Sequence, residues 1–166
     1  MPQHHFLQRA TVLAAATLIM GVVHAAPVTV PFSATATVLQ QIEIKEQANL
    51  AFGKIDKPRT GSQRFTVMVD GSTQVGGAGT GGSFIGGGHQ AGRYDFLGSA
   101  NAAAVLITSG APCSDPSIRL AGVELELPDE VVLPILNARL GGTLVVTPTS
   151  NVGTHTCPYT ITAQYQ

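Results

Sequence analysis

The sequence predicts an all-β protein, an immunoglobulin-like β-sandwich of about seven to nine short strands. Apolar and polar residues alternate with a period of two along most of the chain after residue 26. Glycine, proline and other turn-forming residues interrupt this alternation about every ten residues. After residue 25, no stretch long enough for a helix carries an apolar stripe with helical spacing.

We expect residues 1–25 to be a secretory signal peptide. A polar start that includes Arg9 precedes an apolar run over residues 10–23, and small residues lead to a cleavage site after Ala25. This run is shorter than the ~20 residues of a membrane-spanning helix. We therefore expect a single β-sandwich domain over residues 26–166, with no transmembrane segment in the mature chain. The expected location is the periplasm, the cell surface or the extracellular space.

Alternation predicts the first strand over residues 28–38, and Ile42 and Ile44 continue its apolar parity. The apolar members of this strand are Val28, Val30, Phe32, Ala34 and Ala36. Further strands are predicted over residues 65–69, 94–96, 103–108, 118–127 (as one or two strands), 131–136, 143–147 and 159–165. Pro134 marks the segment 131–136 as an edge strand or a bulge. Residues 129–132 predict no more than a short helical turn.

Glycine fills ten of the 22 positions from Gly71 to Gly92. This composition predicts a long flexible loop, or a pair of flat Gly-rich strands. Within it, residues 77–82 match the spacing G-x-G-x-x-G. A dinucleotide site needs that turn between a buried strand and a helix, and no helix is predicted here. The match therefore follows from composition.

Cys113 and Cys157 are the two cysteines of the chain. An even number of cysteines in an exported chain predicts a disulfide between them, with two free thiols or a metal site as the alternatives. Nine Lys and Arg against ten Asp and Glu give a formal net charge of −1. Without a basic excess, we expect no nucleic-acid partner.

The sequence does not predict an enzyme, and we expect no catalytic residues, cofactor or metal. The two histidines after the expected cleavage site, His89 and His155, lack the neighbouring ligands of a zinc site. A nucleophile pair of Cys157 with His155 would require a free thiol. Glu124 and Glu126 alternate with apolar residues, so we expect them to face solvent.

The end of the chain resembles the assembly strand of chaperone–usher fimbrial subunits, and the alternating run at residues 28–36 resembles a donor strand. At the end of the chain, the resemblance rests on Gly153, fourteenth from the end, and on the alternating Tyr159, Ile161, Ala163 and Tyr165. A donor strand fills the missing strand of another subunit with main-chain hydrogen bonds and alternate side chains. The resemblance implies other copies or related subunits, and a periplasmic chaperone, as partners. Pro27 and Pro31 depart from it because each removes a backbone donor, and both runs also suit ordinary sandwich strands.

A second resemblance covers most of the chain after residue 32. Several blocks, in the same order, resemble the secreted bacterial proteins of domain-of-unknown-function family 4402. They are residues 33–38, 50–53, 91–96, 101–104, 141–146 and 159–165. This resemblance implies a signal peptide, a β-sandwich and no assigned catalytic residues. Cys157 and Pro158 stand where the family usually has a glycine near the start of the last strand.

We therefore expect an exported structural or adhesive surface protein, such as a fimbrial or pilus subunit that assembles by strand donation. The alternative is a monomeric periplasmic or cell-surface binding module without catalytic activity. An assembling subunit should leave an open hydrophobic groove when it is alone. A binding module should close its sandwich with its own strands.

Overall fold

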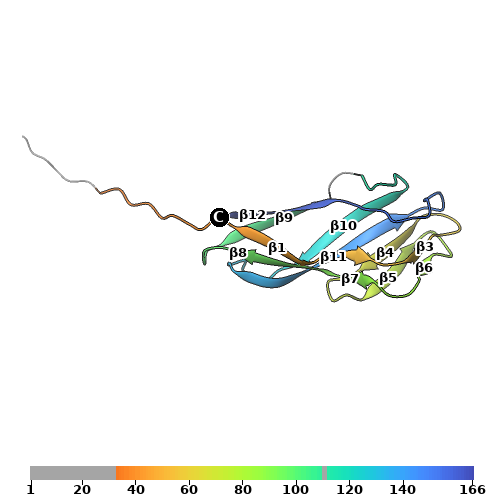
Figure 1. The fold of residues 1–166 in the computed structure, drawn as a ribbon, viewed down its shortest axis with the longest axis horizontal. Helices are drawn as coiled ribbons and strands as arrows, with labels where there is room; N and C mark the ends of the chain where they lie inside the picture. Colours follow the sequence, from red (N-terminus) through yellow and green to blue (C-terminus); the bar gives the residue numbers. More distant parts are fainter. Residues whose placement is uncertain (1–32, 110–111) are drawn as a thin grey trace, which may run out of the picture. The chain divides into compact units, whose positions relative to one another are not determined.

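A computed structural model describes residues 33–109 and 112–166 (Figure 1). The expected signal peptide and three members of the expected first strand, Val28, Val30 and Phe32, lie outside the described residues. The chain divides into two units, residues 1–36 and residues 37–166. Of the first unit, residues 33–36 are described, and they are exposed and form no strand.

The described residues form strands and no helix, so the predicted all-β class is confirmed. No helix among them is long and apolar enough to cross a membrane. There are twelve strands in this part of the chain, more than the seven to nine expected. They are β1 (Glu43–Ala48), β2 (Ala51–Phe52), β3 (Ile55–Asp56), β4 (Gln63–Val67), β5 (Thr73–Gly77), β6 (Ser83–Phe84), β7 (His89–Gln90), β8 (Gly92–Leu97), β9 (Ala103–Ser109), β10 (Ile118–Glu126), β11 (Ile135–Val146) and β12 (Tyr159–Tyr165).

The long strand β11 organises the larger sheet, in which all pairings are antiparallel. Strand β10 pairs with one edge of β11. Strand β8 pairs with the first half of the other edge and β4 with its second half. Strand β1 then pairs with β8, and β5 pairs with β4, so β1 and β5 are outer strands. The second layer is the antiparallel pair of β9 and β12.

The core lies between these layers. The inward side chains of β9 and β12 pack against a cluster built from β8, β11 and Leu133. A second cluster joins β4, β10 and β11 to Cys113. Phe65, Phe96 and Leu140 are completely buried. The two packed layers are consistent with the predicted β-sandwich.

Strand β11 differs from the prediction, which placed two separate strands at residues 131–136 and 143–147. The ladder runs without a break through Gly141 and Gly142. A Cβ at Gly141 would lie 2.8 Å from the Val67 carbonyl oxygen. Glycine is therefore required where β4 approaches closely, and its missing side chain hides the alternation in the sequence.

The Gly-rich stretch 71–92, expected as a long flexible loop or a pair of flat Gly-rich strands, is largely the outer strand of a long interrupted hairpin. Residues 51–67 pair with residues 73–90, from Ala51↔Gln90 at the open end to Val67↔Thr73 beside the tip. The Gly79 N–H donates to the Ser62 carbonyl at 2.8 Å, and the Gly82 N–H donates to Gln63 Oε1 at 2.6 Å. Of the two sequence-based alternatives, paired Gly-rich strands describe this segment better.

The expected strand at residues 28–38 is wrong for its described part. Residues 33–41 form no strand and are exposed, Ala34 and Ala36 included. The first strand begins instead at Glu43. Alternation shows which side chains share a face, but a strand also needs a partner edge, and residues 33–41 pair with none in the part of the chain described.

Candidate functional site

The candidate site lies between the first and the last strands of the described chain. Within the described residues, β1 pairs with β8 alone and β12 pairs with β9 alone. Each strand therefore presents one edge of unpaired backbone N–H and C=O groups. Figure 1 shows β1 and β12 in the two different layers of the sandwich.

A groove of about 330 Å³ opens between these two strands. Its lining residues are Ile44, Glu46, Tyr94, Tyr159 and Ile161. Ile44 pairs with Phe96 and Glu46 with Tyr94, so the side chains of each pair lie on the core face of the sheet. Phe96 is fully buried, yet Ile44 remains 36% exposed. The core is therefore covered beneath β8 and open beside β1.

Hydroxyl and carboxylate groups form the floor of the groove at one end. The Tyr94 hydroxyl donates to Glu46 Oε1 at 3.2 Å, and it also shares a hydrogen bond with the Tyr159 hydroxyl. Burial raises the pKa of Tyr94, and the hydrogen bond to Tyr159 and the charge of Glu46 raise it further. Tyr94 therefore stays protonated and neutral. Its hydrogen bond to Tyr159 links β8 in the larger sheet to β12 in the second layer.

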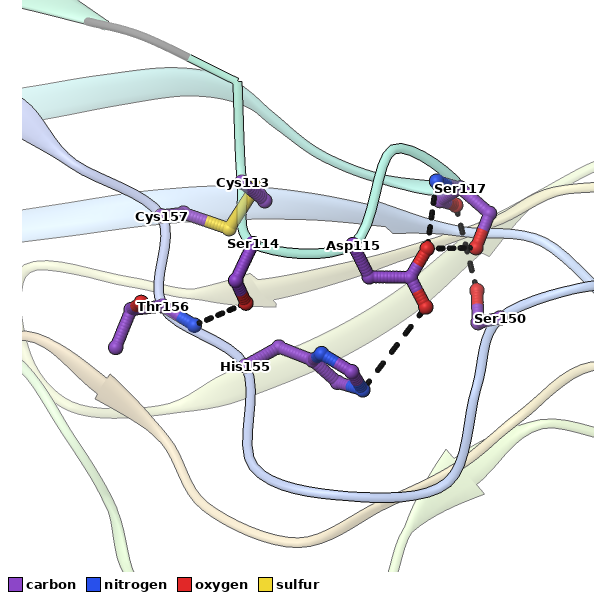
Figure 2. The surroundings of a disulfide bond; sticks show 8 residues. All are labelled: Cys113, Ser114, Asp115, Ser117, Ser150, His155, Thr156 and Cys157. Carbon is purple, nitrogen blue, oxygen red and sulfur yellow. Dashed lines mark hydrogen bonds and ion pairs between the residues drawn. A yellow bond between two sulfur atoms is a disulfide. The ribbon is translucent and has the colours of Figure 1, made fainter.

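Strand β12 is anchored at both of its ends. Before its start, Cys113 and Cys157 form the predicted disulfide, with 4.0 Å between their Cα atoms. The Ser114 N–H donates to the Thr156 carbonyl at 2.9 Å, and the Thr156 N–H donates to Ser114 Oγ at 3.1 Å (Figure 2). At the other end, the Tyr165 hydroxyl binds the segment before β1. An isolated pair of strands is only marginally stable in water. Because β12 pairs with β9 alone, these anchors are needed to hold it in position.

Asp115 fixes the loop that leads from β11 into β12. The Ser117 hydroxyl and N–H donate to Asp115 Oδ1 at 2.5 and 2.8 Å, and the Asn151 N–H donates to Oδ2 at 2.7 Å. His155 Nε2 lies 4.0 Å from Oδ2 (Figure 2). The same nitrogen lies 2.9 Å from the Asn151 carbonyl oxygen. The hydrogen bonds from Ser117 and Asn151, with a smaller contribution from His155, lower the pKa of Asp115 to about 2. Asp115 therefore clamps the loop as a carboxylate.

This loop offers no nucleophile paired with a base. Cys157 is bonded to Cys113, so the thiol that a pair with His155 would need is not free. Across residues 33–109 and 112–166, no three His, Cys, Asp or Glu side chains gather as metal ligands would. Glu124 and Glu126 lie exposed on β10, as expected.

The structure brings part of the expected assembly residues to the groove. Tyr159, Ile161, Ala163 and Tyr165 share the inward face of β12, and all remain only half-buried. Gly153 lies outside β12, in the preceding loop, where its φ of 148° favours glycine. From the expected donor run, Ala34 and Ala36 lie in the exposed segment before β1.

Glu46 and Tyr94 were missed as site residues by the sequence analysis. Glu46 follows Ile42 and Ile44 on the same parity, so a charge stands on what is otherwise an apolar face. This charged residue on an apolar face is the sequence feature that could have identified Glu46 as a site residue. Tyr94 was predicted on a strand, but only the fold brings its hydroxyl to Tyr159 across the sandwich.

A sequence model of the family described as Domain of unknown function (DUF4402) matches residues 42–165. The match extends from the residue before β1 to the last residue of β12, so it includes both walls of the groove. No curated protein matches the chain. No solved structure matches it either.

Proposed function

The chain belongs to the DUF4402 family, and from this premise we propose that it is an exported structural subunit whose sandwich is completed by a strand from another polypeptide. The observation that carries the proposal is the groove between the free edges of β1 and β12. An added strand would find backbone partners on both sides and would cover the partly exposed side chains of Ile44 and Ile161. Strand addition derives its affinity from main-chain hydrogen bonds and its specificity from pockets for alternate side chains.

The composition of the walls supports a strand as the occupant. Ile44 and Ile161 present apolar surface from opposite walls, while the inward residues of β12 remain half-buried. A secreted protein that acts alone has reason to cover such edges, because exposed edges pair with other chains. Among the described strands, β5, β9 and β10 also pair on one side only. Of these, β5 is fully exposed and rich in glycine.

Two observations support export. The Cys113–Cys157 disulfide suits an oxidising compartment outside the cytosol. Residues 1–25 have the pattern of a signal peptide. Assembly outside the cytosol would also need a partner that covers the groove until a strand arrives, which is the role we propose for a periplasmic chaperone.

The alternative of a monomeric binding module predicted a sandwich closed by its own strands. The open groove favours the subunit. A small ligand would leave the backbone groups of β1 and β12 unpaired on both sides, whereas a strand satisfies both rows. An adhesive role would be an addition to the structural one.

The test compares assembly of the wild type with assembly of Ile161→Asp, and uses Thr162→Asp as the matched control. Ile161 faces the groove, while the exposed Thr162 lies next to it on the outer face of the same strand. We expect the wild type and Thr162→Asp to form multimers that survive an unheated denaturing gel. Ile161→Asp should stay monomeric with its disulfide formed. A wild type that forms no multimers at any concentration, with or without a chaperone, contradicts the proposal and favours the binding module.

A further inference from the structure

We infer that the free edge of β5 pairs antiparallel with the same edge of a second copy of this chain, so that the larger sheets of the two copies become one. The two-fold axis of this dimer passes through Val75. The surface differs from the groove between β1 and β12, because β1 and β5 are different outer strands of the larger sheet. The inference therefore goes beyond the proposed function and does not depend on it.

Strand β5 is an outer strand without the usual protection against pairing. Proteins blunt such edges with charged residues, with proline or with a covering element. No Lys, Arg, Asp, Glu or Pro occurs from residue 71 to residue 92. By contrast, the one-sided strands β1 and β10 carry charged side chains, which are Glu43, Lys45, Glu46, Arg119, Glu124 and Glu126. The composition of β5 therefore leaves its edge open to a partner.

The other one-sided strands have neighbours that β5 lacks. Strands β9 and β10 contact each other, and β1 and β12 form the walls of the groove. In the part of the chain that the structure describes, β5 packs chiefly against β4, and every residue of β5 is exposed. A partner can therefore reach this edge without displacing another element.

The hairpin turn before β5 determines which backbone groups point to the free edge. The Met68 N–H donates to the Ser72 carbonyl at 2.8 Å, and β4 and β5 continue this pairing without a shift. Hydrogen-bonded pairs alternate along an antiparallel ladder, so the even-numbered residues of β5 direct their N–H and C=O groups to β4. The odd-numbered Thr73, Val75 and Gly77 direct theirs to the free edge.

A two-fold axis through Val75 uses all three of these residues. Val75 then pairs with Val75 of the second copy, and Thr73 pairs with Gly77 in both directions. An axis through Gln74 or Gly76 would leave one of the three without a partner in β5. Isologous pairing about a two-fold axis is also the commonest symmetry of protein dimers.

The side chains fit this register on both faces of the sheet. Val75 pairs with the completely buried Phe65, yet Val75 is 39% exposed, and Val75 of the second copy would cover it. On the other face, Gln74 lies opposite Gly76 of the second copy. A Cβ at Gly76 would meet nothing within 4 Å, so contacts within the chain do not explain this glycine. Glycine inside a strand often marks the close approach of another group, and the Gln74 side chain of the second copy would occupy that space.

The dimer should be weak and reversible. Its affinity comes from the main-chain hydrogen bonds of one short strand, and interfaces of small area bind weakly. It should therefore dissociate on a denaturing gel, where multimers formed through the groove survive. The two modes of association can be measured separately for this reason.

The first experiment follows self-association by analytical ultracentrifugation of the full exported chain carrying Ile161→Asp, which prevents assembly through the groove from masking the dimer. We expect a dimer that increases with concentration. Val75→Pro removes an N–H that points to the free edge and no hydrogen bond to β4, so it should weaken the dimer roughly tenfold or more, because one hydrogen bond is lost from each copy. Val75→Thr keeps this N–H and is the matched control. Should Val75→Pro fail to fold, Val75→Lys tests the same edge by placing two charges opposite each other.

The second experiment tests the register by crosslinking. Opposite residues of a hydrogen-bonded antiparallel pair have Cα atoms about 5.5 Å apart, which a disulfide can bridge. Val75→Cys should therefore form a covalent dimer under mild oxidation, with the Cys113–Cys157 disulfide intact by peptide mapping. Gln74→Cys should not, because the two copies of residue 74 lie diagonally, about 7–8 Å apart.

Three results would overturn the inference. They are a chain that stays monomeric at every concentration, a Val75→Pro variant that dimerises as tightly as Val75→Thr, and equal crosslinking of Gln74→Cys and Val75→Cys. None of these results affects the proposed function, which depends on multimers of the wild type on the denaturing gel. Loss of those multimers with the ultracentrifuge dimer retained would contradict the proposed function and leave the pairing of β5 in place.

Discussion

The hydroxyl of Tyr165 donates to the carbonyl oxygen of Gln40 at 2.7 Å, across 125 positions of sequence. The same hydroxyl accepts a hydrogen bond from the Ser99 N–H at 2.7 Å. One side chain at the end of β12 thus ties together the segment before β1 and the turn after β8. It fixes the distance between the two strands that form the walls of the groove.

Replacement of Tyr165 by Phe should loosen this end of β12. The variant loses two hydrogen bonds and leaves the partly buried Ser99 N–H without its acceptor, so we expect a loss of about 1–3 kcal/mol in the free energy of unfolding. Denaturant unfolding measures that loss, and amide exchange should increase most near residue 165. Gln164→Ala, on the exposed face of the same strand, should have little effect. Equal stability of Tyr165→Phe and the wild type would show that the anchor is dispensable.

Period-two alternation predicted β4, β8, β9 and β12 because each of these strands packs one face against the core. The alternation gave a wrong prediction where burial depends on whether a partner strand is present. Ala34 and Ala36 alternate as well as Ile161 and Ala163 do, but the former lie exposed. The difference between them is a partner edge, and one chain's alternation does not reveal whether such an edge is present.

Two further features, the continuous strand β11 and the pairing of residues 73–90, were not predicted because glycine has no side chain that could show an alternating pattern. At Gly141 the neighbouring strand leaves no space for a Cβ, so β11 lacked an alternating side chain and appeared as two strands. Along residues 73–90 the pairing partner lies at residues 51–67, and no side chains mark the register. The groove could not be predicted from the sequence either, because Tyr94 and Tyr159 are separated by 65 positions and only the fold brings them together.

Gly82 should tolerate no side chain, in contrast to Gly76 in the same segment. A Cβ at Gly82 would collide with Gln63 Oε1 and lie 2.9 Å from Phe65 Cζ, whereas a Cβ at Gly76 meets nothing within 4 Å. We expect Gly82→Ala to lower the free energy of unfolding by roughly 1–3 kcal/mol through overpacking. Gly76→Ala should be neutral or slightly stabilising, because it restricts the unfolded chain. Thermal unfolding of both variants measures the contrast, and equal effects would contradict the paired arrangement of this segment.

Ionisation of Asp115 should make the free energy of unfolding depend on pH in the acid range. Its pKa is lowered from the ordinary 3.8 to about 2 in the folded protein, so its carboxylate stabilises the fold fully above about pH 4. That contribution should fall as the pH drops from about 4 to about 2, because the unfolded state binds the proton first. Urea unfolding of the wild type and Asp115→Asn should therefore differ most near neutral pH and converge through this window. Asp129→Asn, at an exposed carboxylate, should not show the convergence. A constant difference between wild type and Asp115→Asn would show that ionisation of Asp115 does not stabilise the loop.

Tyr94 should make stability fall in base, with the opposite sign. Its pKa is raised from the ordinary 10.0, so above about pH 10 the unfolded chain releases a proton that the folded protein retains. Linkage then requires stability to decrease as the pH rises through 10. Tyr94→Phe removes this contribution and should lose less stability between pH 9 and pH 11 (about one pH unit on either side of the ordinary value), while Gln164→Ala, which keeps Tyr94, should follow the wild-type slope. The difference in phenolate absorbance between the wild type and Tyr94→Phe should show that Tyr94 ionises only when the protein unfolds. Ionisation of Tyr94 in the native protein near its ordinary pKa would mean that the floor of the groove is open to water, and the Tyr94–Tyr159 link would then not close one end of the site.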